Sequence, residues 1–395
     1  MPKLREIMDA LEGWYDPRWA ESWDAVGLVC GDPDGFVERI VLAVDAVPAT
    51  VAEAVEATAG LLITHHPLLL SGVHGVPADD PKGALVHRMI RSGVAHYVAH
   101  TNADVAAPGV SDALAHLLGL VECVPLNPRP KQLDKLVVFV PEGDAERLID
   151  ALATAGAGQL GDYDRCAWTS VGTGTSRPRP AANPALGRAD EIEVVAEKRV
   201  EMVLARAARD AVLGALHAVH PYEQPAFDLF AMADLPGCLG TGRVGRLTAA
   251  LPLAAFAEQV AAALPGTSWG VRVAGDPRRP VRTVGVCGGA GGSLIETARA
   301  AGADVYLTAD LRHHPALEAV TERGQSGMAL IDAAHWATEA PWLGQVATRL
   351  RHTFGTTVDV TVSTSVTDPW VLHLPSPMNL PSPMNLPSPT NRASH

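Results

Sequence analysis

Apolar positions along the first hundred residues follow two different periods. The spacing over 3–14 predicts an amphipathic helix, and the run RIVLAVD at 39–45 predicts a buried strand. Residues 49–59 again show helical spacing, and 60–64 form a second apolar run that stops before an HHP triplet at 65–67. Short apolar strands that alternate with helices are typical of parallel strands covered on both faces. The pattern therefore predicts an α/β fold.

Two parts of the chain resemble each other. The segment AGLLITHHPLLL at 59–70 is followed by HYVAHTNADVA at 96–106, and AGADVYLTADLRHHPALEA at 301–319 is followed by MALIDAAHWATEA at 328–340. Each pair contains a helix end, an apolar strand, an HHP triplet and a second strand whose end carries a histidine and an acidic residue. Chance readily produces one such triplet. Two triplets with matching partners in the same order favour an internal duplication that forms two similar α/β lobes.

The middle of the chain has a different pattern. Its expected elements are a strand at 135–140, a helix at 144–155, strands at 166–172 and 191–197, a helix at 199–219 and a strand at 226–230. That order, β-α-β followed by β-α-β, is typical of a ferredoxin-like α+β domain. We therefore expect this domain to be inserted over 130–245, between a first lobe over 1–129 and a second lobe over 246–368.

The last part of the chain repeats a hexad. The sequence LPSPMN occurs twice and is followed by LPSPTN, within a stretch rich in proline and serine. Such a repeat cannot form a packed core and favours polyproline II conformations. We expect 369–395 to be a disordered tail with no part in the chemistry.

Composition narrows the class of protein. The 395 residues carry 31 Lys and Arg against 44 Asp and Glu, and the net charge of −13 makes nucleic acid an unlikely main partner. The 5 cysteines are far apart and form no CxxC pair, so reduced thiols are expected. No apolar stretch reaches the length of about 18 residues that a membrane span needs. The N-terminal residues do not resemble a signal peptide, so we expect a cytoplasmic protein.

Histidine is the one residue type with an unusual count, at 15 residues. Two of them, His65 and His66, directly follow an apolar strand. Neighbouring side chains on a strand point to opposite faces, so both imidazoles can reach one site only if the strand has ended and the backbone turns. The carboxyl ends of parallel strands are also where ligands bind in open α/β sheets. A buried histidine bonded to the backbone beside an exposed one explains this pair equally well.

Two further histidines have an acidic residue four positions later. His335 and Glu339 follow another apolar strand, and helical spacing places them on one face; a surface His-Glu pair is the alternative. His100 and Asp104 follow a strand at 94–99, where a turn that caps the next helix is the alternative. Three such clusters at strand ends favour metal binding, and five or more ligands exceed what one tetrahedral ion needs. We therefore expect two divalent ions, and Zn, Mn, Fe, Co and Ni all suit mixed imidazole and carboxylate ligands.

Three other motifs leave alternatives open. The segment GVCGGAGGS at 285–293 could hold a phosphate on its backbone N–H groups, or its glycines could serve close packing of the lobes. It matches neither GxGxxG nor a P-loop, which disfavours dehydrogenases and P-loop NTPases. Trp23-Asp24 and Gly27 could line a site or shape a turn. The stretch HPYE at 220–223 is expected to form a turn in the inserted domain and not a site.

Several motifs together resemble the NGG-interacting-factor-three family, whose bacterial members carry the name GTP cyclohydrolase 1 type 2 homologue. The motifs are WDAVGLVCGD (23–32), THHPLL (64–69), HTNAD (100–104), CGGAGGS (287–293), LTADLRHHP (307–315) and DAAHWATE (332–339). The resemblance covers roughly residues 1–125 and 245–365, and 130–245 looks like the extra domain of the longer members. Many relatives have Gly-Asp where this chain has Ala309-Asp310, which leaves the local turn open.

The resemblance implies a dinuclear metal site and a particular assembly. The metal ligands that it implies are His65, His66, Asp104, His335 and Glu339. Glu339 is implied as the bridge between the two ions, and His100 and His314 as outer donors or substrate contacts. Relatives are similar in forming toroidal hexamers from trimers and dimers, with the metal sites facing an internal cavity, so a homo-oligomer is implied.

Two classes of function fit these expectations. The first is a metal-dependent hydrolase of a nucleotide or another phosphorylated heterocycle, in which two metals activate a water molecule. In a GTP cyclohydrolase reaction the water attacks C8 of guanine and formate leaves; hydrolysis of a phosphoester suits the same site. The alternative is a non-catalytic metal-binding scaffold or metal-trafficking protein whose insert recruits a partner. A pocket beside the metals that is large enough for a purine would favour the enzyme.

Overall fold

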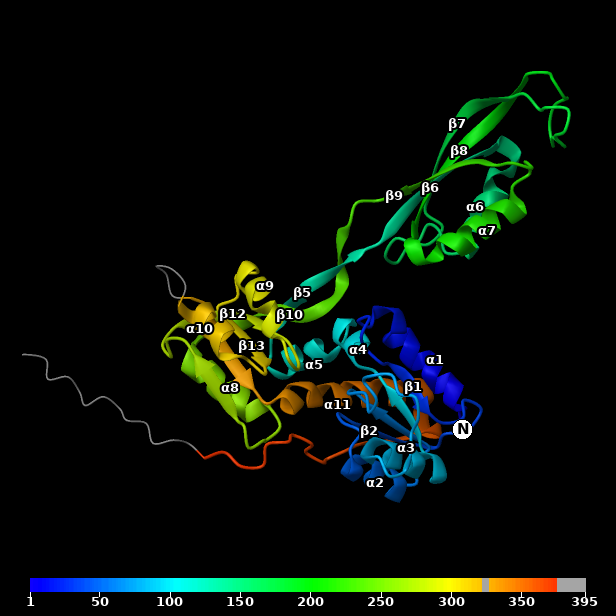
Figure 1. Cartoon of the computed structure of the whole chain (residues 1–395). Helices are drawn as coiled ribbons and strands as arrows, with labels where there is room; N and C mark the ends of the chain where they lie inside the picture. The colour runs from blue at the N-terminus through cyan, green and yellow to red at the C-terminus, as the bar shows by residue number, and fades with distance from the viewer. Residues whose placement is uncertain (322–326, 375–395) are drawn as a thin grey trace, which may run out of the picture. The chain divides into compact units, whose positions relative to one another are not determined.

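The computed structural model describes residues 1–321 and 327–374, and it divides into two compact units (Figure 1). The first unit consists of Met1–Asn127 and the chain from Gly240 onward, and the second is Pro128–Leu239. The fold is mixed α/β with several sheets, as the apolar pattern predicts. The tail expected at 369–395 lies outside the described residues from position 375 onward.

The first sheet of unit 1 has five strands in the order β1-β4-β3-β2-β15. Their bounds are β1 (Gly27–Cys30), β2 (Arg39–Ala43), β3 (Leu61–Thr64), β4 (Ala95–Val98) and β15 (Asp359–Val362). The strands β15, β2, β3 and β4 are parallel, and β1 is an antiparallel edge. Helices α1 (Leu4–Trp14) and α11 (His335–Phe354) cover one face, and α2 (Pro48–Glu56) and α3 (Pro81–Arg91) cover the other. This double cover explains why the central strands are apolar throughout.

The second sheet of unit 1 has six strands in the order β11-β14-β13-β12-β10-β5. Their bounds are β5 (Val121–Lys131), β10 (Leu235–Pro252), β11 (Val271–Ala274), β12 (Pro280–Val286), β13 (Val305–Ala309) and β14 (Ala329–Ala333). Strands β12, β13 and β14 are parallel, whereas β10 and β11 pair with them in the antiparallel direction. Helices α5 (Val110–Leu117) and α8 (Leu253–Ala263) pack on one face, and α9 (Ile295–Ala300) and α10 (His313–Thr321) pack on the other.

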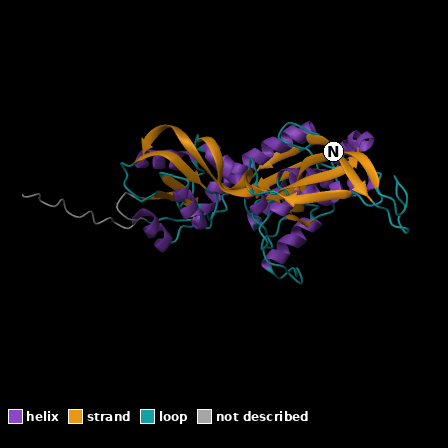
Figure 2. Cartoon of the chain, turned by 90° about the horizontal axis from the view of Figure 1, so that it is seen from above, coloured by secondary structure: helices purple, strands orange, loops and turns teal. Residues whose placement is uncertain are grey.

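Helix α11 joins the two sheets of unit 1. It starts directly after β14 and packs against β2 and β15 of the first sheet and against β13 of the second. Its buried stripe includes Trp342, Val346 and Leu350, which belong to the core of the first sheet. Figure 2 shows helices on both sides of the strands. Because α11 begins where β14 ends, its first turn lies at the carboxyl ends of the parallel strands.

Unit 2 is a four-stranded antiparallel sheet in the order β7-β8-β6-β9. Its elements follow the order β6 (Leu133–Pro141), α6 (Ala145–Thr154), β7 (Ala167–Ser176), β8 (Glu193–Ala205), α7 (Arg209–Val219) and β9 (Ala226–Ala231). The core combines one face of this sheet with α6 and α7.

One expectation in this unit is wrong. The helix expected over 199–219 begins only at Arg209, because β8 continues to Ala205. Val200, Met202 and Leu204 are buried at every second position and pair with β6, which is the period of a strand. The tertiary pairing with β6 therefore decides the structure of a segment whose composition also suits a helix.

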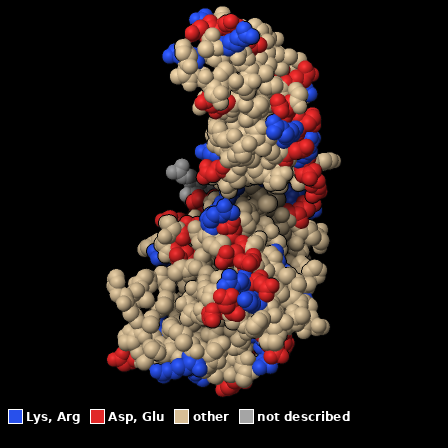
Figure 3. Space-filling view, turned by 90° about the vertical axis from the view of Figure 1, so that its right-hand side faces the viewer, with Lys and Arg blue, Asp and Glu red and all other residues tan. Residues whose placement is uncertain are grey.

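None of the helices within residues 1–321 and 327–374 is long and apolar enough to cross a membrane. On the face drawn in Figure 3, acidic and basic side chains lie beside one another.

Candidate metal centre

The first HHP triplet lies where β3 ends. The backbone still follows β2 for two residues, since the N–H groups of His65 and His66 donate to Ala43 and Val44 at 3.3 and 2.8 Å. The hydroxyl of Thr64 then donates to the carbonyl of His66 at 2.8 Å, which closes a tight turn. The turn brings both imidazoles to one side, with ring centroids 5.0 Å apart.

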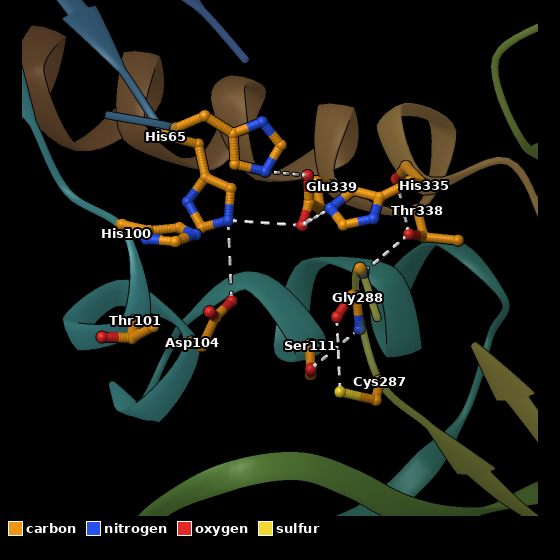
Figure 4. A network of polar contacts seen from close by, with 12 residues as sticks. His65, His100, Thr101, Asp104, Ser111, Cys287, Gly288, His335, Thr338 and Glu339 are labelled. Atoms are coloured by element: carbon orange, nitrogen blue, oxygen red, sulfur yellow. Dashed lines mark hydrogen bonds and ion pairs between the residues drawn. The ribbon is translucent and has the colours of Figure 1, made fainter. Parts of the chain in front are cut away.

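Two acidic residues from different helices meet these imidazoles (Figure 4). Glu339, on the second turn of α11, places Oε2 at 3.0 Å from His66 Nε2 and Oε1 at 3.5 Å from His65 Nε2. The same Oε1 lies 3.0 Å from Nε2 of His335, four residues earlier on the helix. Asp104, on the short helix α4 (Thr101–Val105), approaches His65 Nε2 to 3.7 Å. The carboxylate of Glu339 therefore lies among three imidazoles.

His100 brings a fourth imidazole to the cluster. Its ring centroid lies 5.2 Å from that of His65 and 5.4 Å from that of His66. Two overlapping groups of possible metal ligands result: His65, His66 and His100 form one, and His66, His335 and Glu339 form the other.

All four imidazoles use Nδ1 for a hydrogen bond inside the protein and turn Nε2 toward the cluster. The four acceptors are the carbonyl of Ala99 for His65 at 2.9 Å, and Asp45 for His66, Asp24 for His100 and Asp310 for His335, each at 2.7 Å. A proton on Nδ1 leaves the lone pair of a neutral imidazole on Nε2. Metal-binding histidines almost always donate their other N–H to a carboxylate or carbonyl in this way.

Opposite charges hold the cluster together in the protein without metal. Burial lowers the pKa of His66, but the charge of Glu339 and the hydrogen bond to Asp45 outweigh this effect and bring that pKa to about 11. A similar balance, with Asp310 in the place of Asp45, brings the pKa of His335 to about 10. Although burial raises the pKa of Glu339, the surrounding imidazoles hold it well below its usual value. A cation that binds here must displace the imidazole protons.

Two buried atoms of the cluster are held by ion-pair contacts alone. His65 Nε2 and Glu339 Oε2 are both inaccessible to water and make no hydrogen bond of good geometry within the described chain, although Glu339 Oε1 lies 3.5 Å from the first and His66 Nε2 lies 3.0 Å from the second. Imidazole nitrogen with carboxylate oxygen is a donor set that suits several divalent metals. The residues present therefore fit a bound metal ion.

The glycine-rich loop after β12 packs against the cluster. Gly289 has a φ of +65°, and a Cβ at this position would lie 2.3 Å from Glu339 Oε1 and 3.1 Å from His335 Nε2. Only glycine allows both this backbone conformation and this close approach.

Three N–H groups of the same loop already have acceptors inside the protein. Those of Gly288, Gly289 and Gly291 donate to the hydroxyls of Ser111, Thr338 and Thr308 at 3.3, 2.9 and 2.8 Å. They are therefore not free to hold a phosphate. Of the two interpretations of this loop, the structure supports close packing.

A pocket of about 480 Å³ opens beside the cluster. His100, Asp104, His335 and Glu339 line it on one side, and the loop at 287–294 lines it on another. Trp23, which is 58% exposed, forms part of the wall and meets the His100 ring edge-on at 6.0 Å. None of the described residues that line this pocket is Lys or Arg.

The structure brings His65, His66, His100, Asp104, His335 and Glu339 together, but it does not bring His314 to them. His314 is exposed on α10, and its ring packs against that of His313 at 5.2 Å. We therefore leave His314 out of the site.

The sequence pattern does not identify the carboxylates Asp45 and Asp310 as hydrogen-bond partners of the histidines. For Asp24 it allows either a place in the site or a role in shaping a turn. The available signal is their position, since Asp45 follows β2 and Asp310 follows β13 at the carboxyl ends of the sheets. Asp332, which lies three residues before His335, accepts from Arg272 and from the N–H of Leu311.

Four imidazoles and two carboxylates at the strand ends of a mixed α/β fold define a candidate metalloprotein. The chain matches the Duf34/NIF3 (NGG1p interacting factor 3) family over residues 2–369. It is 52% identical over 372 residues to the GTP cyclohydrolase 1 type 2 homolog of Mycobacterium leprae, covering 94% of this chain and 95% of that protein. The protein of the same name from Streptomyces coelicolor is 38% identical over 381 residues, which cover 95% and 96% of the two chains.

A solved structure agrees with these matches. The crystal structure of a Bacillus cereus protein related to NIF3 is similar with a TM-score of 0.79 and 33% identity, and it covers 94% of this chain and 99% of that one. The chain therefore belongs to the Duf34/NIF3 family.

Proposed function

We propose that the cluster binds two divalent metal ions through His65, His66, Asp104, His335 and Glu339. The observation that carries this proposal is the common orientation of the imidazoles, which all direct Nε2 inward because Nδ1 is held from outside. Glu339 would contribute to both ions, since its carboxylate lies among His65, His66 and His335. Zn, Mn, Fe, Co and Ni all remain candidates for the ions.

The proposed activity is metal-dependent hydrolysis of a nucleotide. Two divalent ions lower the pKa of a water molecule and polarise the group that it attacks. The chain contributes the orientation of this centre: Asp45 and Asp310 fix the rings of His66 and His335, and Gly289 lets the loop close over Glu339.

The charges of the pocket favour attack on the ring of a heterocycle over attack on a phosphoester. Glu21, Asp104 and Glu339 line the pocket, and none of its described lining residues is Lys or Arg, so the metal ions, with His100 and His335 beside them, would supply the attraction for phosphate. Trp23 offers a flat apolar face beside His100, which suits the base of a purine nucleotide. The proposal is therefore a GTP cyclohydrolase-like reaction, in which water attacks the purine ring and formate leaves.

The second candidate is a non-catalytic metal-binding regulator or metal-trafficking protein. A closed metal site would favour it, whereas this cluster borders an open pocket of about 480 Å³, which lies within the size range of ligand sites. The open pocket supports the enzyme.

The test uses the full chain loaded with each candidate metal. Formate release from GTP and phosphate release from a panel of nucleotides would be measured for the wild type and for His335→Ala. Formate release that depends on metal and on His335 supports the proposal. If neither product forms and the variant behaves like the wild type, the protein is not a hydrolase of these compounds.

We also propose that the chain contains an internal duplication and an inserted domain. Three parallel strands with an antiparallel edge strand recur as β2-β3-β4 with β1 and as β12-β13-β14 with β11, which supports a duplication. In both, a histidine stands two residues after the third strand and an acidic residue four positions later. We take 130–245 as an inserted ferredoxin-like domain and the whole as a cytoplasmic homohexamer, to be tested by mass photometry of the purified protein.

A further inference from the structure

The C-terminal segment 363–370 runs between the two sheets of unit 1 (Figure 1). At its start, the N–H of Ser363 donates to the carbonyl of Leu42 on β2 at 2.8 Å. At its end, the ring of Trp370 packs against that of Trp269, which precedes β11, with centroids 5.7 Å apart. The segment therefore has a backbone hydrogen bond to β2 at its start and a ring contact with Trp269 at its end, and Thr367 lies between these two contacts.

Thr367 touches the carboxylate that orients His66. Its hydroxyl donates to Oδ2 of Asp45, while Oδ1 of Asp45 accepts from Nδ1 of His66 at 2.7 Å. His66 in turn directs Nε2 to Glu339 at 3.0 Å. A chain of hydrogen bonds therefore leads from the C-terminal segment through Asp45 to the cluster.

We propose that Thr367 is a positioning residue for one of two cation positions, the position bounded by His66, His335 and Glu339. This inference rests on the proposed function, because it presumes that cations bind at the cluster. A carboxylate whose second oxygen is held cannot rotate freely, so it keeps its imidazole aimed at the metal. The other position would be held by His65 and Asp104, and the ring of His65 is oriented by the carbonyl of Ala99 instead.

The test is a titration of the metal-free full chain with Co²⁺, followed by visible absorption and calorimetry. The wild type is expected to bind two equivalents. In Thr367→Val, which removes the hydroxyl at nearly constant volume, one equivalent should bind about tenfold more weakly while the other is unchanged. Thr367→Ser, which keeps the hydroxyl, should bind both equivalents like the wild type.

Thr364→Val is the matched control, since Thr364 is an exposed threonine of the same segment. It should bind both equivalents like the wild type, and all metal-free variants should unfold at the same temperature. Weakening of both equivalents in Thr367→Val, together with a lower unfolding temperature, would reduce Thr367 to a structural residue and overturn the inference.

A parallel titration of His335→Ala distinguishes a failure of the positioning role from a failure of the proposed metal centre. If His335→Ala loses one equivalent while Thr367→Val binds like the wild type, the inference fails and the proposed metal centre stands. If the wild type takes up no Co²⁺, the proposed function itself fails.

Discussion

The triplet HHP occurs twice in the chain, and the two copies have different surroundings. At 65–67 it begins directly after β3, and both imidazoles turn into the cluster. At 313–315 it begins four residues after β13 and opens α10, where both histidines are exposed. The residue directly after β13 is Asp310, which holds the ring of His335. The same three residues therefore differ in role because their distance from the end of a strand differs.

The largest expected effect on metal affinity comes from replacing the second histidine of each triplet. His66→Ala should weaken metal binding by more than about 100-fold, beyond the range that outer partners of a ligand produce. His314→Ala should leave metal affinity unchanged, since His314 packs only against its neighbour among the ring contacts described. Metal content after dialysis and calorimetric titration would check both. Equal losses in the two variants would contradict the assignment of the site to one triplet.

Two glycines, one on each side of helix α9, test the same comparison through the backbone. Gly289 and Gly302 have similar φ values, +65° and +74°, but only at Gly289 would a Cβ meet Glu339. Gly302→Ala should cost about 1–2 kcal/mol of unfolding free energy from backbone strain alone. Gly289→Ala should cost more and should also weaken metal binding, because Glu339 must move. Denaturant unfolding with and without metal would separate the two effects, and unchanged metal binding in Gly289→Ala would contradict the described packing.

Aspartates at the two ends of β13 allow a further test, with a smaller expected effect, of whether position at the strand end decides the role of a side chain. Asp310 follows the strand and holds His335, whereas Asp304 precedes it and accepts from the N–H groups of Arg282 and Thr283. Asp310→Asn should weaken metal binding about tenfold, because the amide holds the imidazole less firmly. Asp304→Asn should lower stability without a change in metal affinity. A comparable loss of affinity in both variants would show that general destabilisation, and not ring orientation, is the cause.

The pH dependence of the metal-free protein is the smallest expected effect. The folded pKa values of His66 and His335, about 11 and about 10, exceed the unfolded value of about 6.5. Their contribution to stability is therefore fully present below about pH 6.5 and is lost as the pH rises through these values.

In the presence of a chelator, the thermal midpoint of the wild type should fall by a few degrees between about pH 7 and about pH 10. The fall should be smaller in His66→Gln, which has lost one of the titrating imidazoles. Parallel curves for the two proteins would show that His66 does not titrate as described.

Local pattern anticipates much of the first unit. The helix expected at 3–14 is confirmed as α1, and the apolar runs at 39–45 and 60–64 contain β2 and β3. These elements are readable because a parallel strand covered on both faces must be apolar throughout, and a surface helix must carry an apolar stripe. The expected helix at 199–219 fails because β8 depends on its pairing with β6, a partner about sixty residues earlier in the chain.

The sequence by itself determined the membership in the Duf34/NIF3 family, the mixed α/β class and the histidines and acids that stand just after apolar strands. Tertiary structure alone decided which of these residues meet. The partners of the four ring nitrogens lie 21, 25, 34 and 76 residues away along the chain, and Thr367 lies 322 residues from Asp45. Such contacts follow from the packing of strand ends in space, because the hydrophobic pattern specifies where a strand ends but not which other strand end it will face.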